Sequence, residues 1–472
     1  MASQNVNNIQ IKNVNQGGIS DSDYLGARNS VAELVGINIH DEAGIMKLNQ
    51  RLAEIDDATS AIDGLIKSIV PASNGNTYFF NSGNGKVWKR TSGGVWSLLF
   101  TASPAAGAAG ILCAREYQGY VYYAMQSRLG RFDLATETNA DSWATFGVTD
   151  ADYHPMREVN QVLYIGDGNQ VAQVDAGTFS ANALDIKTPL RISALGKYST
   201  DLLVGTYVAS NVVGTEILRW NTWSDSFSVS DTIPEVGVNA FLETDNRIVV
   251  SCGTKGNLYM YNGRDLEWYK QIKGTWGNST NKAIVHPNAV MNFHGLPLFG
   301  LSQQTGTGVS LGVYSFGRTN PNYPYVLALE YPISTGSLTG IEIGAIAPYG
   351  DQFYVSWKEG SSYGVDLLDL SNKYATGWIT TRNTLFDRNM ESTYRKIQVP
   401  YRSYPTGTDI DISVSKNHGA MTEITDTKVD AKRLLVETNK DVGECSVFKG
   451  KVTLTGSDND SPEIELINIE VV

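Results

Sequence analysis

The five histidines are the side chains best suited to acid–base or metal chemistry, and they are scattered along the chain. They stand at positions His40, His154, His286, His294 and His418. None forms the His-x-x-x-His pair of a zinc site, and none belongs to a Ser/His/Asp signature of known mechanics. We therefore expect histidines in turns or on the surface, and we predict no catalytic or cofactor-binding residue.

Carboxylates offer a second kind of chemistry. Asp351, Asp366 and Asp369 are close in sequence and could meet at one rim of a fold. A glycosidase needs two carboxyl groups about 5 to 10 Å apart across a cleft. No spacing here indicates such a pair, so we interpret these residues as solvated strand ends.

Two further segments and the exposed aromatic side chains could bind a cation or a sugar. The segment SDNDSPE at 457–463 concentrates oxygen ligands but lacks the Gly and the ordered positions of a calcium loop. The segment SGNGKVW at 82–88 faintly resembles the Asp-box loops of sialidases, without their Asp or spacing, and we expect only a turn. Exposed Trp and Tyr could stack on sugars, although within strands these residues more often form core. No metal site is predicted.

Cysteine usage and charge exclude several classes of protein. Cys113, Cys252 and Cys445 are far apart, without a Cys-x-x-Cys pair, so we expect buried free thiols. The net charge of −12 and the pI near 5.0 argue against specific nucleic-acid binding. No apolar run approaches the roughly 20 residues of a membrane span. The segment 1–5 is polar and lacks the features of a secretory signal, so we expect assembly in a cytoplasm.

The elements that would position any site are strands that repeat. The segment 76–100, NTYFFNSGNGKVWKRTSGGVWSLLF, holds apolar, aromatic-rich runs separated by Gly corners. Similar units return at intervals of about 40 residues, the period of four-stranded propeller blades. The first unit predicts strands at 66–70, 77–80, 86–89 and 95–99.

Seven such units fit the chain. The third has a corner at Asn160-Gln161 and a turn at Asp167-Gly168. We place the sixth from Ala289 to Tyr331, and the seventh at 343–371, closed by GWITT at 377–381. The pattern favours an all-β fold with a seven-bladed β-propeller, while another blade count or stacked sandwiches remain open.

The two ends of the chain do not follow the repeat. Residues 1–62 predict an extended N-terminal arm and linker, with one edge strand at Ile45–Leu52. Residues 391–472 alternate in short strands typical of a C-terminal antiparallel β-sandwich. The expected domains are therefore 1–62, 63–390 and 391–472. Because the first 30 or so residues are mostly polar, we expect them to be ordered only against another subunit.

Taken together, the arm, the seven units and the terminal sandwich resemble the tail hub and nozzle proteins of short-tailed bacteriophages. The arm NVNQGGISDSDYLGARNSVAELVGINIHDEAGIMKLNQRL carries the short motifs Gly17-Gly18-Ile19 and Ala43-Gly44-Ile45, with Ala43 where many such arms have Pro. The resemblance implies a structural virion component and no enzyme. It also implies a homo-oligomeric ring around the DNA exit channel of the tail.

The same resemblance implies partners and a location. The ring would contact a portal-side adaptor above and distal tail proteins below, and DNA would pass without specific nucleic-acid binding. The protein would be assembled in the host cytoplasm and reside in the virion tail. Two alternatives remain, a carbohydrate-binding receptor-recognition propeller and a glycosidase.

Overall fold

The chain forms two compact units. The computed structural model describes residues 7–56, 62–103, 110–148, 153–208, 214–244, 247–275, 280–385, 392–424, 427–438 and 443–471. The ring unit contains residues 54–312 and 337–367, and the sandwich unit contains residues 1–53, 313–336 and 368–472. Apart from one 3-10 turn, η1 (Val14–Gln16), the regular elements in these ranges are strands.

The ring unit begins with five complete antiparallel sheets of four strands each. The first sheet contains β6 (Ile66–Pro71), β7 (Thr77–Asn81), β8 (Lys86–Arg90) and β9 (Trp96–Thr101). The second contains β10 (Cys113–Tyr117), β11 (Tyr120–Met125), β12 (Arg128–Asp133) and β13 (Asn139–Thr145). The third contains β14 (Met156–Val159), β15 (Val162–Asp167), β16 (Gln170–Asp175) and β17 (Thr178–Asp185). The fourth contains β18 (Leu190–Tyr198), β19 (Asp201–Val208), β20 (Thr215–Trp220) and β21 (Val229–Ile233). The fifth contains β22 (Val238–Glu243), β23 (Ile248–Cys252), β24 (Asn257–Tyr261) and β25 (Leu266–Gln271).

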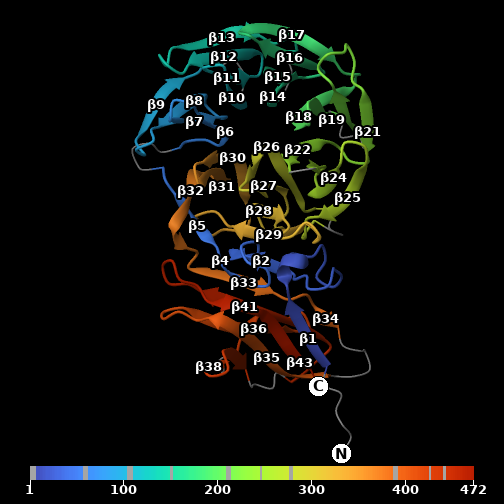
Figure 1. Cartoon of the computed structure of the whole chain (residues 1–472), viewed down its shortest axis with the longest axis vertical. Helices are drawn as coiled ribbons and strands as arrows, with labels where there is room; N and C mark the ends of the chain where they lie inside the picture. Colours follow the sequence, from blue (N-terminus) through green and yellow to red (C-terminus); the bar gives the residue numbers. More distant parts are fainter. Residues whose placement is uncertain are drawn as a thin grey trace, which may run out of the picture. The chain divides into compact units, whose positions relative to one another are not determined.

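Two further sheets complete the ring. The sixth starts with the hairpin of β26 (Lys282–Phe293) and β27 (Leu296–Thr305), and the seventh with β30 (Ile341–Tyr349), β31 (Gln352–Glu359) and β32 (Ser362–Lys373). The innermost strands β6, β10, β14, β18, β22, β26 and β30 contact one another in this order, and β30 returns to β6 (Figure 1). This closed cycle confirms the expected seven-bladed β-propeller.

Aromatic side chains hold neighbouring blades together. Phe80 of the first blade packs against Tyr123 and Phe132 of the second, with ring centroids 6.2 and 6.4 Å apart. All three rings are fully buried, so each blade covers the apolar face of the next. The corners are those expected from the sequence, since Asn160 and Gln161 both adopt positive φ between β14 and β15.

The sixth blade starts earlier than expected. Its first strand begins at Lys282 rather than at Ala289, because β26 continues through a bulge between Val285 and Val290. Pro287 in this bulge removes a backbone donor and resembles a strand break in the sequence. The predicted sixth blade therefore omitted the first half of β26.

The seventh blade is closed by a different segment from the one predicted. Its sheet has the order β30-β31-β32-β5, where β5 (Gln50–Glu54) comes from the N-terminal segment. Next to this strand, the Ile55 amide donates to the Val365 carbonyl at 3.0 Å. GWITT instead forms β33 (Thr376–Thr380), which lies between two strands of the sandwich unit.

The sandwich unit contains two large sheets. One has the order β28 (Gly312–Gly317), β29 (Val326–Tyr331), β2 (Glu33–Val35), β33, β41 (Val447–Thr455), β36 (Asp409–Lys416) and β37 (Thr422–Glu423), with β34 (Thr384–Leu385) beside β41. The other has the order β1 (Asn7–Lys12), β43 (Leu466–Val471), β35 (Ser392–Ser403), β39 (Leu435–Thr438) and β38 (Thr427–Asp430), with β40 (Gly443–Cys445) and β42 (Glu463–Ile464) beside β35. A small pair, β3 (Ile37–Asn38) and β4 (Lys47–Leu48), completes it. Alternate residues of β36 and β41 are buried, as expected for a sandwich.

The N-terminal arm folds within its own chain. Strand β1 pairs with β43 over its whole length, and the Ile19 amide donates to the Leu327 carbonyl at 2.8 Å. The expectation that the first 30 or so residues are ordered only against another subunit or partner is therefore wrong for residues 7–30. Its polar residues find partners inside the chain, since Asn15 donates to the Thr319 hydroxyl at 2.9 Å. The three consecutive domains expected from the sequence do not coincide with the two interleaved units.

Two simpler observations concern the described residues. Cys113, Cys252 and Cys445 are buried free thiols, as expected. No helix in the described part of the chain is long and apolar enough to cross a membrane.

Candidate functional site

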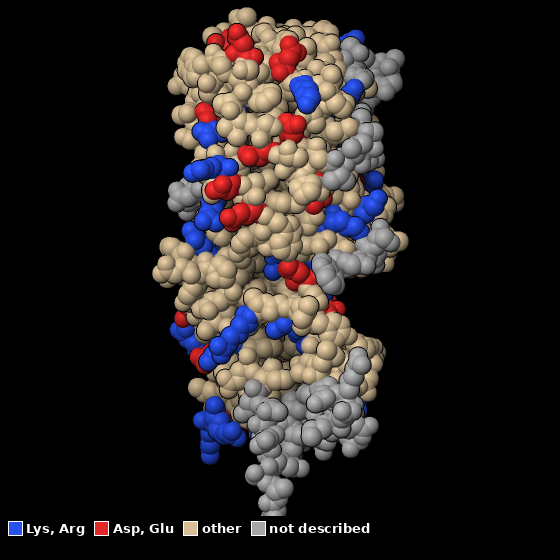
Figure 2. All heavy atoms as spheres, turned by 90° about the vertical axis from the view of Figure 1, so that its right-hand side faces the viewer, with Lys and Arg blue, Asp and Glu red and all other residues tan. Residues whose placement is uncertain are grey.

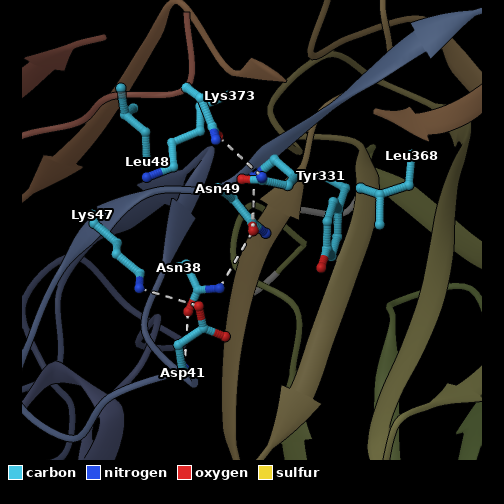
Figure 3. A pocket seen from close by; sticks show the side chains of 10 residues that line it. Asn38, Asp41, Lys47, Leu48, Asn49, Tyr331, Leu368 and Lys373 are labelled. Carbon is cyan, nitrogen blue, oxygen red and sulfur yellow. Dashed lines mark hydrogen bonds and ion pairs between the residues drawn. The ribbon is translucent and has the colours of Figure 1, made fainter. Parts of the chain in front are cut away.

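A polar pocket in the sandwich unit is the candidate functional site. Its volume is about 400 Å³ (Figure 3). Strands β3 to β5 and the loops between them supply most of its wall, and the ends of β29 and β32 and one loop near the C-terminus supply the rest. It is lined by Asn38, Asp41, Lys47, Leu48, Asn49, Gln50, Tyr331, Leu368, Lys373 and Asn459.

Asn38 shapes one wall of this pocket. Its Oδ1 accepts hydrogen bonds from the backbone amides of His40 and Asp41, both at 3.0 Å, and so fixes the turn that follows β3. Its Nδ2 donates to Asn49 Oδ1 at 3.3 Å (Figure 3). Asn49 Nδ2 in turn faces Glu330 Oε2 at 3.4 Å. A chain of amides thus leads from the pocket wall into the interior.

Behind this wall lies a buried histidine–glutamate pair. His40 Nε2 is 3.5 Å from Glu330 Oε1, and the two side chains are 8% and 0% exposed. Burial lowers the pKa of His40 to about 4 and raises the pKa of Glu330 to about 8. Both groups are therefore held neutral near pH 7.

Sequence reasoning missed Glu330. The signal was present, because Glu330 is the one charged residue within VLALEY, a strand buried at every position. His40 was expected in a turn or on the surface, and it is almost completely buried.

The rim of the pocket carries charge. Lys47 Nζ pairs with an Asp41 carboxylate oxygen at 3.2 Å, and Gln50 Nε2 donates to Asn459 Oδ1 at 3.3 Å. Lys373 has no such partner among the described residues. Burial and the neighbouring Lys47 lower the pKa of Lys373, although the charges of Glu463, Asp460 and Asp41 act in the opposite direction.

Of the other histidines, two are structural. His154 is fully buried, stacks on Phe146 with ring centroids 4.1 Å apart, and contacts the Gly166 and Gln126 carbonyl oxygens. It is therefore a core residue, whereas a histidine in a turn or on the surface was expected. His286 Nε2 lies 3.0 Å from Glu342 Oε1, which lowers the pKa of Glu342.

The remaining two histidines lie where the sequence placed them. His294 and His418 have positive φ at turns and are exposed. His418 contacts the Tyr24 hydroxyl, and His294 is 3.9 Å from Asp351. The five histidines do not converge on one site.

The centre of the ring is bridged by a side chain. Asn288 of β26 donates to the Lys67 carbonyl of β6 at 2.7 Å and lies 3.5 Å from Cys113 Sγ of β10. The sixth blade thereby contacts the first and the second across the ring. Sequence reasoning gave no signal for this contact, which depends on the bulge in β26.

The three carboxylates considered for glycoside hydrolysis have separate partners. Asp351 is 86% exposed at a turn. Asp366 is buried and accepts from Trp357 Nε1 at 2.8 Å, whereas Asp369 accepts from Arg51 Nε at 3.2 Å. They are not brought together as a catalytic pair.

The loops considered for cations have structural partners as well. In 457–463, Ser461 Oγ accepts from the Leu48 amide at 2.8 Å. Before 82–88, Asn81 Oδ1 accepts from the Gly83 amide at 2.8 Å; residues 82–84 form the expected turn, and 86–88 begin β8. In the ranges that the structure describes, no group of three or more His, Cys, Asp or Glu side chains is placed to hold a metal ion.

Among the described residues of the ring unit, two tryptophans are exposed. Trp223 is 84% and Trp268 is 54% exposed, whereas residues such as Tyr122 and Phe79 are core. Acidic and basic side chains are interspersed on the face shown in Figure 2. Such mixing is typical of a solvated surface.

Comparisons with known proteins extend only to the fold. No protein-family model matches the chain, and no curated protein matches its sequence significantly. The extracellular domain of a hybrid two-component system from B. thetaiotaomicron is similar at a TM-score of 0.50 and 9% identity, covering 87% of this chain and 57% of that one. A second such domain from B. thetaiotaomicron gives 0.48 and 13%, covering 70% and 44%. A catalytically inactive virginiamycin B lyase from Staphylococcus aureus gives 0.48 and 14%, covering 68% and 100%.

These neighbours define a class of fold and no activity. This chain spans less than two thirds of both extracellular domains. At such low identities, the likeness supports the β-propeller fold alone. The chain is a seven-bladed β-propeller protein that also contains a sandwich unit.

Proposed function

We propose that this protein is a structural component of a tailed-phage virion, a hub or nozzle-type tail protein without enzymatic activity. Several copies would form a ring around the DNA exit channel, between a portal-side adaptor and distal tail proteins. The proposal rests on the overall plan of arm, propeller and sandwich, and on one observation about how the chain ends are joined.

That observation is the interweaving of the two chain ends in one unit. Strand β1 lies against β43, and β2 lies between β29 and β33. Arm and sandwich are therefore one folded body, held by main-chain hydrogen bonds between segments more than 290 residues apart. Such a body resists local unfolding, which suits a subunit that must withstand packaged DNA.

Exposed apolar side chains of the sandwich unit support contacts with neighbours. Leu25 is 71% and Leu385 is 62% exposed, and each directly follows a residue, Tyr24 or Thr384, that lines a groove of about 320 Å³. Apolar side chains at a groove are common in subunit interfaces. We place the contacts between ring subunits here.

DNA would pass along the axis of the oligomer that several copies form, rather than through the propeller of a single copy. Asn288 bridges the centre of each propeller, which leaves no path for a duplex there. The net charge of −12 reduces attraction to phosphate along the exit path.

Quantitative mass spectrometry of purified particles tests this role. We expect the protein in particles at a constant ratio to the capsid protein, retained after high-salt washing and density-gradient purification. A protein found only in the lysate supernatant, or lost on washing, would argue against a virion component.

A carbohydrate-binding propeller is the second candidate, and the exposed Trp223 favours it. An indole 84% exposed can stack on a sugar ring. A glycan array with the wild type and Trp223→Ala tests this candidate. Signals lost in the variant would support glycan binding by the ring unit.

A further inference from the structure

The polar pocket of the sandwich unit leaves specific hydrogen-bonding groups unused. Asn38 and Asn49 satisfy one another and the surrounding backbone, as described above. Lys373 Nζ and Asn459 Nδ2 donate to no residue that the structure describes. Gln50 Nε2 donates to the Leu370 carbonyl and to Asn459 Oδ1, so Gln50 Oε1 remains available as an acceptor.

These groups are arranged as a mixed set. Lys373 and Asn459 are donors, and Gln50 Oε1 and the Asp41 carboxylate are acceptors. Lys373 is partly withdrawn from water and forms no ion pair with a described residue, while the charges of Glu463, Asp460 and Asp41 only partly offset the cost of its desolvation. The nearest cation, Lys47, is already paired with Asp41 at 3.2 Å (Figure 3).

A ligand that satisfies this set needs one anionic group and several hydroxyls. A carboxylate would accept from Lys373 and Asn459 in charge-assisted hydrogen bonds. Hydroxyls would donate to Gln50 and Asp41. The volume of about 400 Å³ lies within the usual range for small-ligand sites.

We propose that this pocket binds a sugar unit that bears a carboxylate, such as a hexuronic acid. Lys373 and Asn459 hold the carboxylate, and Gln50 and Asp41 accept from the ring hydroxyls. A plain anion leaves the two acceptors unused, and a neutral sugar leaves Lys373 unpaired. The pocket therefore distinguishes the acidic sugar from both.

Isothermal titration of the full chain with glucuronate, glucose and acetate tests this site. We expect saturable binding of glucuronate, at least about tenfold tighter than that of glucose or acetate, because each lacks half of the contacts. Lys373→Met should weaken glucuronate binding about tenfold or more. Lys428→Met, at an exposed lysine of the same unit, is the matched control and should bind like the wild type.

A second variant keeps the test decisive if Lys373→Met does not fold. Asn459→Ala changes a loop side chain and should weaken glucuronate binding several-fold. Absence of saturable glucuronate binding to the folded wild type would overturn the proposal. Equal affinity for glucose or acetate, or unchanged affinity in the folded variants, would overturn the assigned contacts.

Discussion

His40 and Glu330 form a buried pair, with Nε2 and Oε1 3.5 Å apart and both side chains almost completely removed from solvent. His40 follows β3 of the N-terminal arm, and Glu330 lies in β29, 290 positions later. The pair thus joins the arm to β29 within the sandwich unit, and its protonation should control the stability of that unit.

The first prediction concerns Glu330 at alkaline pH. Burial raises the pKa of Glu330 from 4.5 to about 8, so the folded state holds a proton that the unfolded chain has released. Stability should therefore fall as pH rises through this window, by about 1.4 kcal/mol per pH unit. Glu330→Gln keeps the shape without ionising and should gain about 2 kcal/mol over the wild type between pH 6.5 and 8.

Urea denaturation of both proteins at the two pH values measures this gain. His40 acts in the opposite direction at lower pH, because its pKa is lowered from 6.5 to about 4 and stability falls as pH drops through that window. The two effects offset one another between about pH 4.5 and 6.5. If the difference in unfolding free energy between Glu330→Gln and the wild type stays constant above pH 6.5, Glu330 is not held neutral in the folded state.

The second prediction concerns the strand that closes the seventh blade. Leu52 of β5 is 2% exposed, and its replacement by Ala should cost about 2–5 kcal/mol. Arg51 on the same strand pairs with Asp369 at the surface, and Arg51→Ala should cost less than about 1 kcal/mol. Thermal unfolding of the two variants compares neighbouring positions of one strand. Equal effects would mean that β5 is not buried as described.

The third prediction concerns the arm. Because β1 pairs with β43 and Ile11 is 7% exposed, limited proteolysis should leave residues from about position 7 onward intact. Mass spectrometry of the protected fragment checks this. Loss of the first 30 residues from the isolated protein would show that the arm needs a partner to be ordered.

The fourth prediction concerns the centre of the ring. Asn288→Ala removes the hydrogen bond to Lys67 and should destabilise the protein by about 1 kcal/mol. Asn182→Ala, in the exposed outer strand β17, is the control and should change stability by less than about 0.5 kcal/mol. Denaturation midpoints of the two variants give the comparison. If Asn288→Ala leaves the free energy of unfolding unchanged, the hydrogen bond from Asn288 to Lys67 does not stabilise the protein.

Local pattern was sufficient to predict most of the propeller. In the first blade, aromatic strands and Gly corners alternate, and the strands lie within two residues of their expected positions. Contacts between distant segments were not predictable in this way. The partner of β5 lies more than 300 positions away, and an outer strand such as Gln50–Glu54 has few apolar residues to identify it.

The pocket could not be predicted for the same reason. Its lining comes from the arm, from the ends of β29 and β32, and from a loop near the C-terminus. Each segment alone is an ordinary polar turn or strand end. Only Glu330, a carboxylate inside an apolar run, gave a local signal of a buried polar site.

Electron cryo-microscopy of the tail of purified particles tests the central claim most directly. We predict several copies of this chain related by rotation about the tail axis, each recognisable by its seven-bladed disc, with the DNA path along the axis between copies. Density for the portal-side adaptor should lie above the ring and distal tail proteins below it. A tail map in which no seven-bladed disc surrounds the axis would contradict the proposed role.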